Sequence, residues 1–158
     1  MDFGDTAKYI NLFFDDRKLY LFDTFHGFSD TDIKHEVSLN TMTESVAHYY
    51  DKRSCEADVI KRMFYPELCV IKKGVFPDSL EGLEDRFAFV HIDCDLSKPI
   101  KDALEYFYPR LSEGGYICVH DYFNPRFPGV QTVMRDFSEK HRVKMIPVPG
   151  YNGAIITK

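Results

Sequence analysis

Apolar residues in the second half of the chain alternate between strand and helix patterns. Residues 87–92 form a continuous apolar run, which is typical of a strand buried on both faces of a parallel sheet. A helical face then begins near Ser97 and is expected to end at Gly114. The members of this face are Ile100, Ala103, Leu104, Phe107, Tyr108 and Leu111. Residues 116–119 predict the next strand.

The C-terminal part of the chain predicts one more helix and a pair of strands. The helical face consists of Val130, Val133, Met134 and Phe137. Strands are expected at residues 143–148 and 154–157. Residues 149–153 separate them by a turn that is short enough for an antiparallel hairpin at the edge of the sheet.

The first half of the chain is less regular. Helices are expected at residues 5–13, from Thr43 onward, and across 57–64 up to Pro66. Strands are expected at 18–22 and 68–71. Residues 26–45 are mixed and polar, so we interpret them as a lid or loop segment.

This alternation predicts an α/β fold, with a three-layer, doubly wound and mostly parallel sheet that closes on an antiparallel hairpin. The length of 158 residues suits one domain, 1–158. A net charge of -5 without a basic block argues against nucleic acid or a membrane surface as a partner. We expect the four cysteines, which lack CxxC spacing, to be reduced. No signal peptide or membrane span is indicated, and we expect a cytoplasmic protein.

Acidic residues follow three predicted strands, at the sheet edge where α/β proteins place their ligands. Asp93 and Asp121 directly end apolar strands, which makes them the best candidates for metal ligands. Asp95 could equally cap the helix that begins near Ser97. Asp23 could accept hydrogen bonds from a ribose. The alternative for all of them is a set of solvated turns with helix-capping acids.

The histidines allow several interpretations. His120 could bind the metal, act as a general base, orient a neighbour, or be a merely hydrogen-bonded buried residue. His91 is expected to be structural, whereas His26 and His35 in the lid could reach a substrate. A flat ring could approach the backbone at Gly74 and pack on Phe76, although an ordinary turn explains these residues as well.

Four short motifs occur in order along the chain. They are KLYLFDTFHGF at residues 18–28, KGVFP at 73–77, HIDCDL at 91–96 and GGYICVHDY at 114–122. Together they resemble the macrocin O-methyltransferase (TylF-like) family of class I S-adenosylmethionine-dependent, divalent-metal-dependent enzymes. The resemblance covers nearly the whole chain and implies a Rossmann-like fold.

The resemblance also implies roles for individual residues. Asp23 would hold the ribose of S-adenosylmethionine, Gly74 and Phe76 would lie near the adenine, and Asp93 and Asp121 would bind magnesium beside the acceptor hydroxyl. Family members methylate sugar hydroxyls of natural products or related glycans. The expected partner is therefore a small-molecule carbohydrate acceptor.

The chain departs from the family pattern in two ways. The second metal motif is Asp-Asp in the macrolide and aminocoumarin branches and His120-Asp121 here, and an imidazole shifts metal preference from magnesium towards manganese or other transition ions. The family's first strand and glycine-rich turn should precede residues 4–9, and only Gly4, at the edge of that turn, remains. Without a central strand its neighbours would expose unpaired edges. We therefore expect a homo-oligomer, weak cofactor binding, or both.

Two functions follow from these observations. The first is an O-methyltransferase in which Asp93 or His120 acts as the catalytic base, with His120 as a third metal ligand beside Asp93 and Asp121. The second is a non-catalytic methyltransferase-like domain that keeps the fold without competent cofactor binding. A metal-dependent hydrolase ranks below both, because no base for a metal-bound water is apparent beyond His120.

Overall fold

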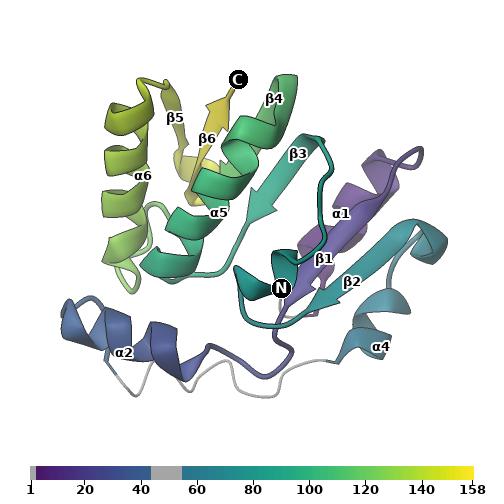
Figure 1. Ribbon diagram of the computed structural model, residues 1–158, viewed down its shortest axis with the longest axis horizontal. Helices are drawn as coiled ribbons and strands as arrows, with labels where there is room; N and C mark the ends of the chain where they lie inside the picture. The colour runs from purple at the N-terminus through teal and green to yellow at the C-terminus, as the bar shows by residue number, and fades with distance from the viewer. Residues whose placement is uncertain (1–2, 44–54) are drawn as a thin grey trace. The chain divides into compact units, whose positions relative to one another are not determined.

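The computed structural model describes residues 3–43 and 55–158, and these fall into two compact units (Figure 1). Unit 1 comprises Met1–Ser29 and Ser45–Glu81, and unit 2 comprises Asp30–Glu44 and Gly82–Lys158. Each unit contains its own sheet. In the described part of the chain, no helix is long and apolar enough to cross a membrane.

The described part of unit 1 contains a parallel pair of strands and the helices α1 and α4. Its elements are α1 (Asp5–Phe13), β1 (Leu19–Asp23), α4 (Glu56–Ile60), η2 (Pro66–Leu68), β2 (Cys69–Lys73) and η3 (Asp78–Leu80). β1 and β2 pair in parallel, from Leu19 opposite Cys69 to Asp23 opposite Lys73. The buried core of the unit consists of Ala7, Leu21, Phe25, Val59 and Met63.

The buried Asn11 fixes α1 to the segment before β2. Its amide donates to the carbonyl of Tyr65 at 3.1 Å, and its amide oxygen accepts the Tyr65 N–H at 2.7 Å. Ala7, near the start of α1, packs in the same cluster as Phe25, just beyond the end of β1. The beginning of α1 therefore lies near the carboxyl end of β1.

Unit 2 is a mixed sheet with the strand order β3-β4-β6-β5. Its elements are α2 (Asp30–Ser38), β3 (Phe87–Ile92), α5 (Ser97–Arg110), β4 (Leu111–Val119), α6 (Pro128–His141), β5 (Met145–Val148), η4 (Pro149–Tyr151) and β6 (Gly153–Thr157). β3 and β4 are parallel, whereas β6 runs antiparallel to both β4 and β5. The α/β class and the closing hairpin are thus confirmed. The unit 2 sheet is mixed rather than mostly parallel, because β6 lies between β4 and β5.

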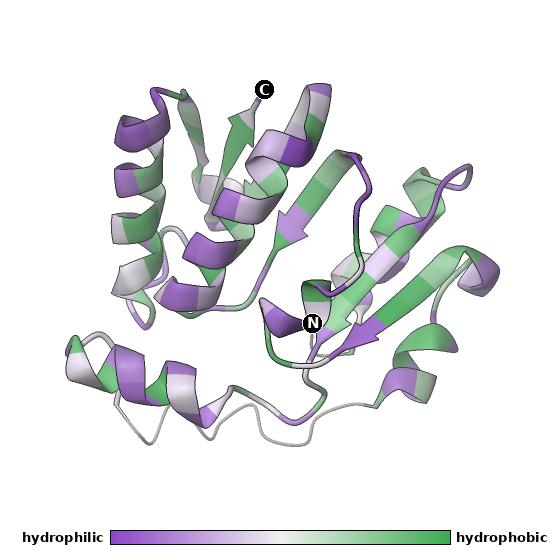
Figure 2. Cartoon of the chain, viewed as in Figure 1, coloured by the Kyte–Doolittle hydropathy of each residue, from purple (hydrophilic) through white to green (hydrophobic). Residues whose placement is uncertain are grey.

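Helices α5 and α6 pack beside one another, and α5 contacts β3 and β4 (Figure 1). The strands are largely hydrophobic, while the side of α5 turned away from them is largely hydrophilic (Figure 2). The largest fully buried side chains of the unit include Leu96, Ile100, Leu104, Leu111, Ile117, Met134 and Ile156. These positions include much of the helical face that the sequence predicts.

Two expectations about elements are wrong. Residues Asp30–Ser38, within the segment interpreted as a lid or loop, form helix α2. The two residues that α2 buries are Asp32 and Glu36, so the helix has no apolar stripe that a sequence pattern could reveal. Helix α5 ends at Arg110, and Gly114 lies within β4 instead of ending the helix. The helix expected from Thr43 lies largely in residues 44–54, outside the described residues.

Candidate active site

The ends of β3 and β4 carry the acidic and histidine residues together. The strands pair in register from Val90 opposite Ile117 to Ile92 opposite Val119. One further hydrogen bond, from the N–H of His120 to the carbonyl of Ile92 at 2.9 Å, extends this pairing beyond the strands. Asp93 and His120 therefore leave the sheet side by side, as expected for the carboxyl ends of neighbouring parallel strands.

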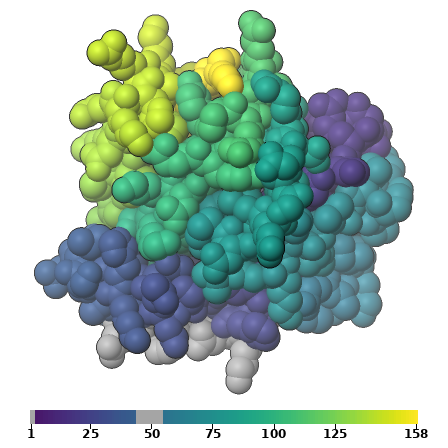
Figure 3. All heavy atoms as spheres, viewed as in Figure 1, coloured from purple at the N-terminus to yellow at the C-terminus, as the bar shows by residue number. Residues whose placement is uncertain are grey.

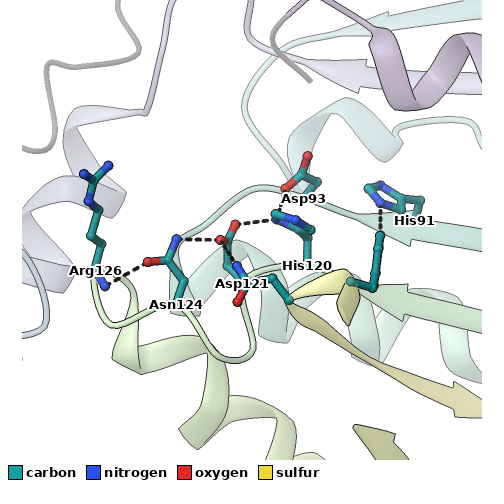
Figure 4. Close-up of polar contacts among 8 residues, drawn as sticks. His91, Asp93, His120, Asp121, Asn124 and Arg126 are labelled. Carbon is teal, nitrogen blue, oxygen red and sulfur yellow. Dashed lines mark hydrogen bonds and ion pairs between the residues drawn. The ribbon is translucent and has the colours of Figure 1, made fainter. Parts of the chain in front are cut away.

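His120 joins the two carboxylates of the cluster (Figure 4). Its Nδ1 lies 2.8 Å from Oδ2 of Asp121 and 3.2 Å from Oδ1 of Asp93. One potential ligand atom from each of the three residues lies within 4.8 Å of the others. The structure thus brings together the three residues that sequence reasoning selected for a metal, and the donor set of two carboxylates and an imidazole suits a divalent transition ion.

The histidine and the carboxylates of the cluster shift one another's pKa values. The hydrogen bond with Asp93 raises the pKa of His120 to about 9, opposed by burial and reinforced by Asp121. Burial alone would raise the pKa of Asp93, but the hydrogen bond and charge of His120 outweigh it and hold that pKa below its ordinary value. Without an ion, a protonated His120 compensates the negative charge of the carboxylates.

Asp121 is buried and held by two asparagines. The side-chain amide of Asn124 donates to Oδ1 of Asp121 at 2.6 Å, and the amide of Asn152 donates to the same atom at 3.2 Å. The backbone of Asp121 is left-handed, with a φ of 61°. These contacts leave Oδ2 directed at His120. Sequence reasoning missed both asparagines, because no motif marks them.

The sequence allows Asp95 to cap helix α5, but in the structure Asp95 does not do so. The N-cap residue is Leu96, and its side chain makes no capping hydrogen bond. Burial, a hydrogen bond with Asp121 and the charges of Asp93 and Asp121 raise the pKa of Asp95 to about 8. A carboxyl group that keeps its proton near neutral pH thus lies next to the cluster, which residue spacing alone does not reveal.

His91 lies beside the cluster and makes a hydrogen bond through Nε2 with the hydroxyl of Tyr151. Burial lowers the pKa of His91 below its ordinary value. His26 and His35 are exposed, and neither belongs to the ligand cluster found in the described residues. In the sequence, only the turn at residues 149–153 marks the position of Tyr151.

The residues expected to bind the cofactor lie in unit 1. Gly74, with a φ of 148°, donates its N–H to the carbonyl of Asp23 at 3.0 Å, so these residues meet where β1 and β2 end. The carboxylate of Asp23 also accepts the N–H of Phe25 at 2.7 Å. Phe76 is half-buried and packs edge-to-face on Phe22, with ring centroids 6.0 Å apart. Gly4 precedes α1 with a φ of 78°.

Relatives with known activities match much of the chain. It is 28% identical over 132 residues to an 8-demethyl-8-(2,3-dimethoxy-alpha-L-rhamnosyl)-tetracenomycin-C 4'-O-methyltransferase of Streptomyces olivaceus. The matched region covers 75% of this chain and 44% of the relative. It is 25% identical over 134 residues to the mycinamicin III 3''-O-methyltransferase of Micromonospora griseorubida, covering 81% and 52%. The chain thus spans about half the length of these curated relatives.

Solved structures of methyltransferases share the fold. The calicheamicin methyltransferase CalS11 superposes with a TM-score of 0.69 at 21% identity, covering 98% of this chain and 66% of that one. The O-methyltransferase NovP gives a TM-score of 0.66 at 23% identity, covering 90% and 60%. The family model for macrocin-O-methyltransferase (TylF) matches residues 10–148. The chain belongs to the macrocin-O-methyltransferase (TylF) family.

Proposed function

We propose that the protein transfers a methyl group from S-adenosylmethionine to a sugar hydroxyl of a natural product, with the help of a divalent ion. The observation that carries this proposal is the cluster of Asp93, His120 and Asp121 in a chain of the TylF family. Two relatives are named for methylation of glycosylated natural products, and a structural relative for methylation of TDP-rhamnose. These names support a sugar as the acceptor.

The residues of the cluster would hold the ion through one atom each, Oδ1 of Asp93, Nδ1 of His120 and Oδ2 of Asp121. A bound divalent ion would lower the pKa of a nearby hydroxyl and orient it. Manganese suits this donor set better than magnesium, because one ligand is an imidazole. In unit 1, Asp23 would accept hydrogen bonds from the ribose, and Gly74 and Phe76 would border the adenine, with Gly4 near the methionine part.

In the reaction, the acceptor oxygen forms a bond to the methyl carbon as the carbon–sulfur bond of the sulfonium breaks, leaving S-adenosylhomocysteine. The hydroxyl proton passes to a base of the cluster, Asp93 or His120, at an atom other than the one that would hold the ion. Positioning of the hydroxyl in line with the methyl group is a large part of such a rate enhancement. The residues of this chain therefore act by binding and orienting the acceptor hydroxyl and by accepting its proton.

Metal binding can be tested separately from catalysis. Manganese at millimolar concentration should raise the melting temperature, because an ion that binds only the folded state stabilises it by mass action. Asp93→Ala and Asp121→Ala should abolish this shift, while Asp136→Asn, which changes an exposed acid on α6, should keep it. A parent protein whose midpoint does not respond to manganese or magnesium would contradict the metal site.

Methyl transfer is tested with an acceptor such as TDP-rhamnose and radiolabelled S-adenosylmethionine. Asp121→Asn should lose most methylation while calorimetric binding of S-adenosylhomocysteine survives, because the ion acts on the acceptor. Asp136→Asn should match the parent in both. A parent that binds no S-adenosylhomocysteine and transfers no methyl group would favour the non-catalytic alternative.

A further inference from the structure

We infer that Tyr151, in the turn between β5 and β6, is a positioning residue that holds the ring of His120 with Nδ1 towards Asp93 and Asp121. The inference rests on the proposed function, because it concerns the same cluster. It adds a residue that no sequence motif marks. It also gives the turn between β5 and β6 a role in the site.

Tyr151 contacts both histidines. Its hydroxyl is hydrogen bonded to Nε2 of His91, and its ring lies edge-on to His91 with centroids 6.1 Å apart. The ring of His120 is also edge-on, at 5.4 Å and an interplanar angle of 75°. His91 belongs to β3, so its hydrogen bond anchors Tyr151 to the sheet. The second imidazole that the Tyr151 ring contacts is that of His120.

The turn is built around the Tyr151 ring. A Cβ atom on Gly153 would lie 2.7 Å and 2.8 Å from two ring carbons of Tyr151, and 2.5 Å from the carbonyl oxygen of Val119. No side chain fits there, so the ring packs directly against the backbone of the first residue of β6. Asn152 between them is left-handed, with a φ of 57°, and donates to Asp121. The turn therefore supplies contacts to two adjacent residues of the cluster.

An imidazole can rotate about its χ2 angle, and only some orientations direct Nδ1 at both carboxylates. The Tyr151 ring occupies space beside His120 and thereby restricts this rotation. Residues that orient a ligand without touching the metal commonly set its affinity. The ring of Tyr151, more than its hydroxyl, makes the contact with His120.

Two variants separate the ring from the hydroxyl. Tyr151→Phe keeps the ring, and Tyr151→Leu removes it. Tyr116→Leu, the same change at a half-exposed tyrosine of β4, serves as the matched control. Manganese binding is measured by calorimetry, and the imidazole N–H signal of His120 is measured by nitrogen-edited NMR of the metal-free protein. The melting temperature reports whether each variant folds.

Tyr151→Leu should weaken manganese binding about tenfold or more, while Tyr151→Phe and Tyr116→Leu should stay within about threefold of the parent. The Nδ1–H signal of His120 should be broadened or lost only in Tyr151→Leu. Unchanged affinity and an unchanged signal in that variant would overturn the inference and leave the proposed function intact. If the parent binds no manganese but Tyr151→Leu loses the signal, the metal site fails and the positioning of His120 stands.

Discussion

Glu36 of α2 accepts two hydrogen bonds from Ser97, the first residue of α5: one from the backbone N–H at 2.6 Å and one from the hydroxyl. Both residues are buried, with exposed fractions of 3% and 6%. The second carboxylate oxygen of Glu36 accepts the hydroxyl of Thr41. A carboxylate at the N-terminus of a helix is favoured by the unpaired N–H groups and the helix dipole. In Figure 3 the atoms of α2 lie directly against those of α5.

Loss of the Glu36 carboxylate should therefore destabilise unit 2. Glu36→Ala leaves the buried N–H of Ser97 without this acceptor, which should lower the free energy of unfolding by about 1–3 kcal/mol. Glu36→Gln, which keeps an acceptor oxygen, should cost less. Removal of the partly exposed carboxylate that pairs with Lys140, in Glu105→Ala, should cost about 1 kcal/mol or less. Urea unfolding of the three variants measures the ranking, and equal losses for Glu36→Ala and Glu105→Ala would contradict it.

The same contact explains which parts of the molecule could be predicted from the sequence. β3, α5 and α6 have buried apolar faces with the periodicity of their element, so their positions were predictable. Helix α2 instead buries Asp32 and Glu36, and Glu36 accepts a hydrogen bond from Ser97, far along the chain. The periodicity of apolar residues cannot indicate a helix whose buried side chains are acidic.

The candidate site likewise contains some residues that could be predicted from the sequence and others that could not. Asp93 and Asp121 were predictable because each acid follows an apolar strand, and the parallel pairing of β3 with β4 brings them together. Tyr151 and Asn152 come from a turn whose position depends on β6 returning beside β4. Tertiary pairing of this kind has no local sequence signal, so these supporting residues could not be predicted.

The two asparagines that hold Asp121 should differ in importance. Asn124→Ala removes the 2.6 Å hydrogen bond and should weaken manganese binding about tenfold, because supporting residues of this kind typically contribute that much. Asn152→Ala removes the 3.2 Å contact and should cost less. Calorimetry with manganese gives both values. A greater loss for Asn152→Ala would show that the shorter contact is not the stronger support.

Gly115 of β4 should not tolerate a side chain. A Cβ there would lie 2.8 Å from Cγ of Leu111, 2.9 Å from the carbonyl oxygen of Ser112 and 3.0 Å from that of Ala88. Since two of these atoms are backbone, Gly115→Ala should destabilise the protein by about 1–3 kcal/mol. Gly150→Ala meets no atom within 4 Å and should change stability by less than about 0.5 kcal/mol. Thermal unfolding of the pair tests the difference, and a neutral Gly115→Ala would contradict the packing around β4.

The metal-free protein should lose stability as the pH rises from 6.5 to about 9. The folded-state pKa of His120 is about 9 against an ordinary 6.5, and that of Asp95 is about 8 against 3.8. Both groups bind a proton more tightly when folded, so the unfolded state holds fewer protons and stability falls with pH across this window. The stabilisation from His120 is complete below pH 6.5 and is lost through pH 9. Urea unfolding with a chelator measures the slope, which should diminish in His120→Asn; stability that rises with pH would contradict the assignment.

Manganese should remove the part of this pH dependence that comes from His120. The ion and the proton compete for Nδ1 of His120, which retains its proton up to a pKa of about 9 because Asp93 and Asp121 stabilise the charged ring. Binding at pH 7 should therefore release about one proton, and the apparent affinity should rise about tenfold per pH unit up to about pH 9. Calorimetry in buffers of different ionisation enthalpy counts the released proton. His120→Asn has no ring to deprotonate, so it should bind the ion more weakly and with little change between pH 7 and 9. A parent affinity that is constant over this range, or a slope that persists in His120→Asn, would show that the imidazole is not a ligand and that the ion, if bound, is held by carboxylates alone.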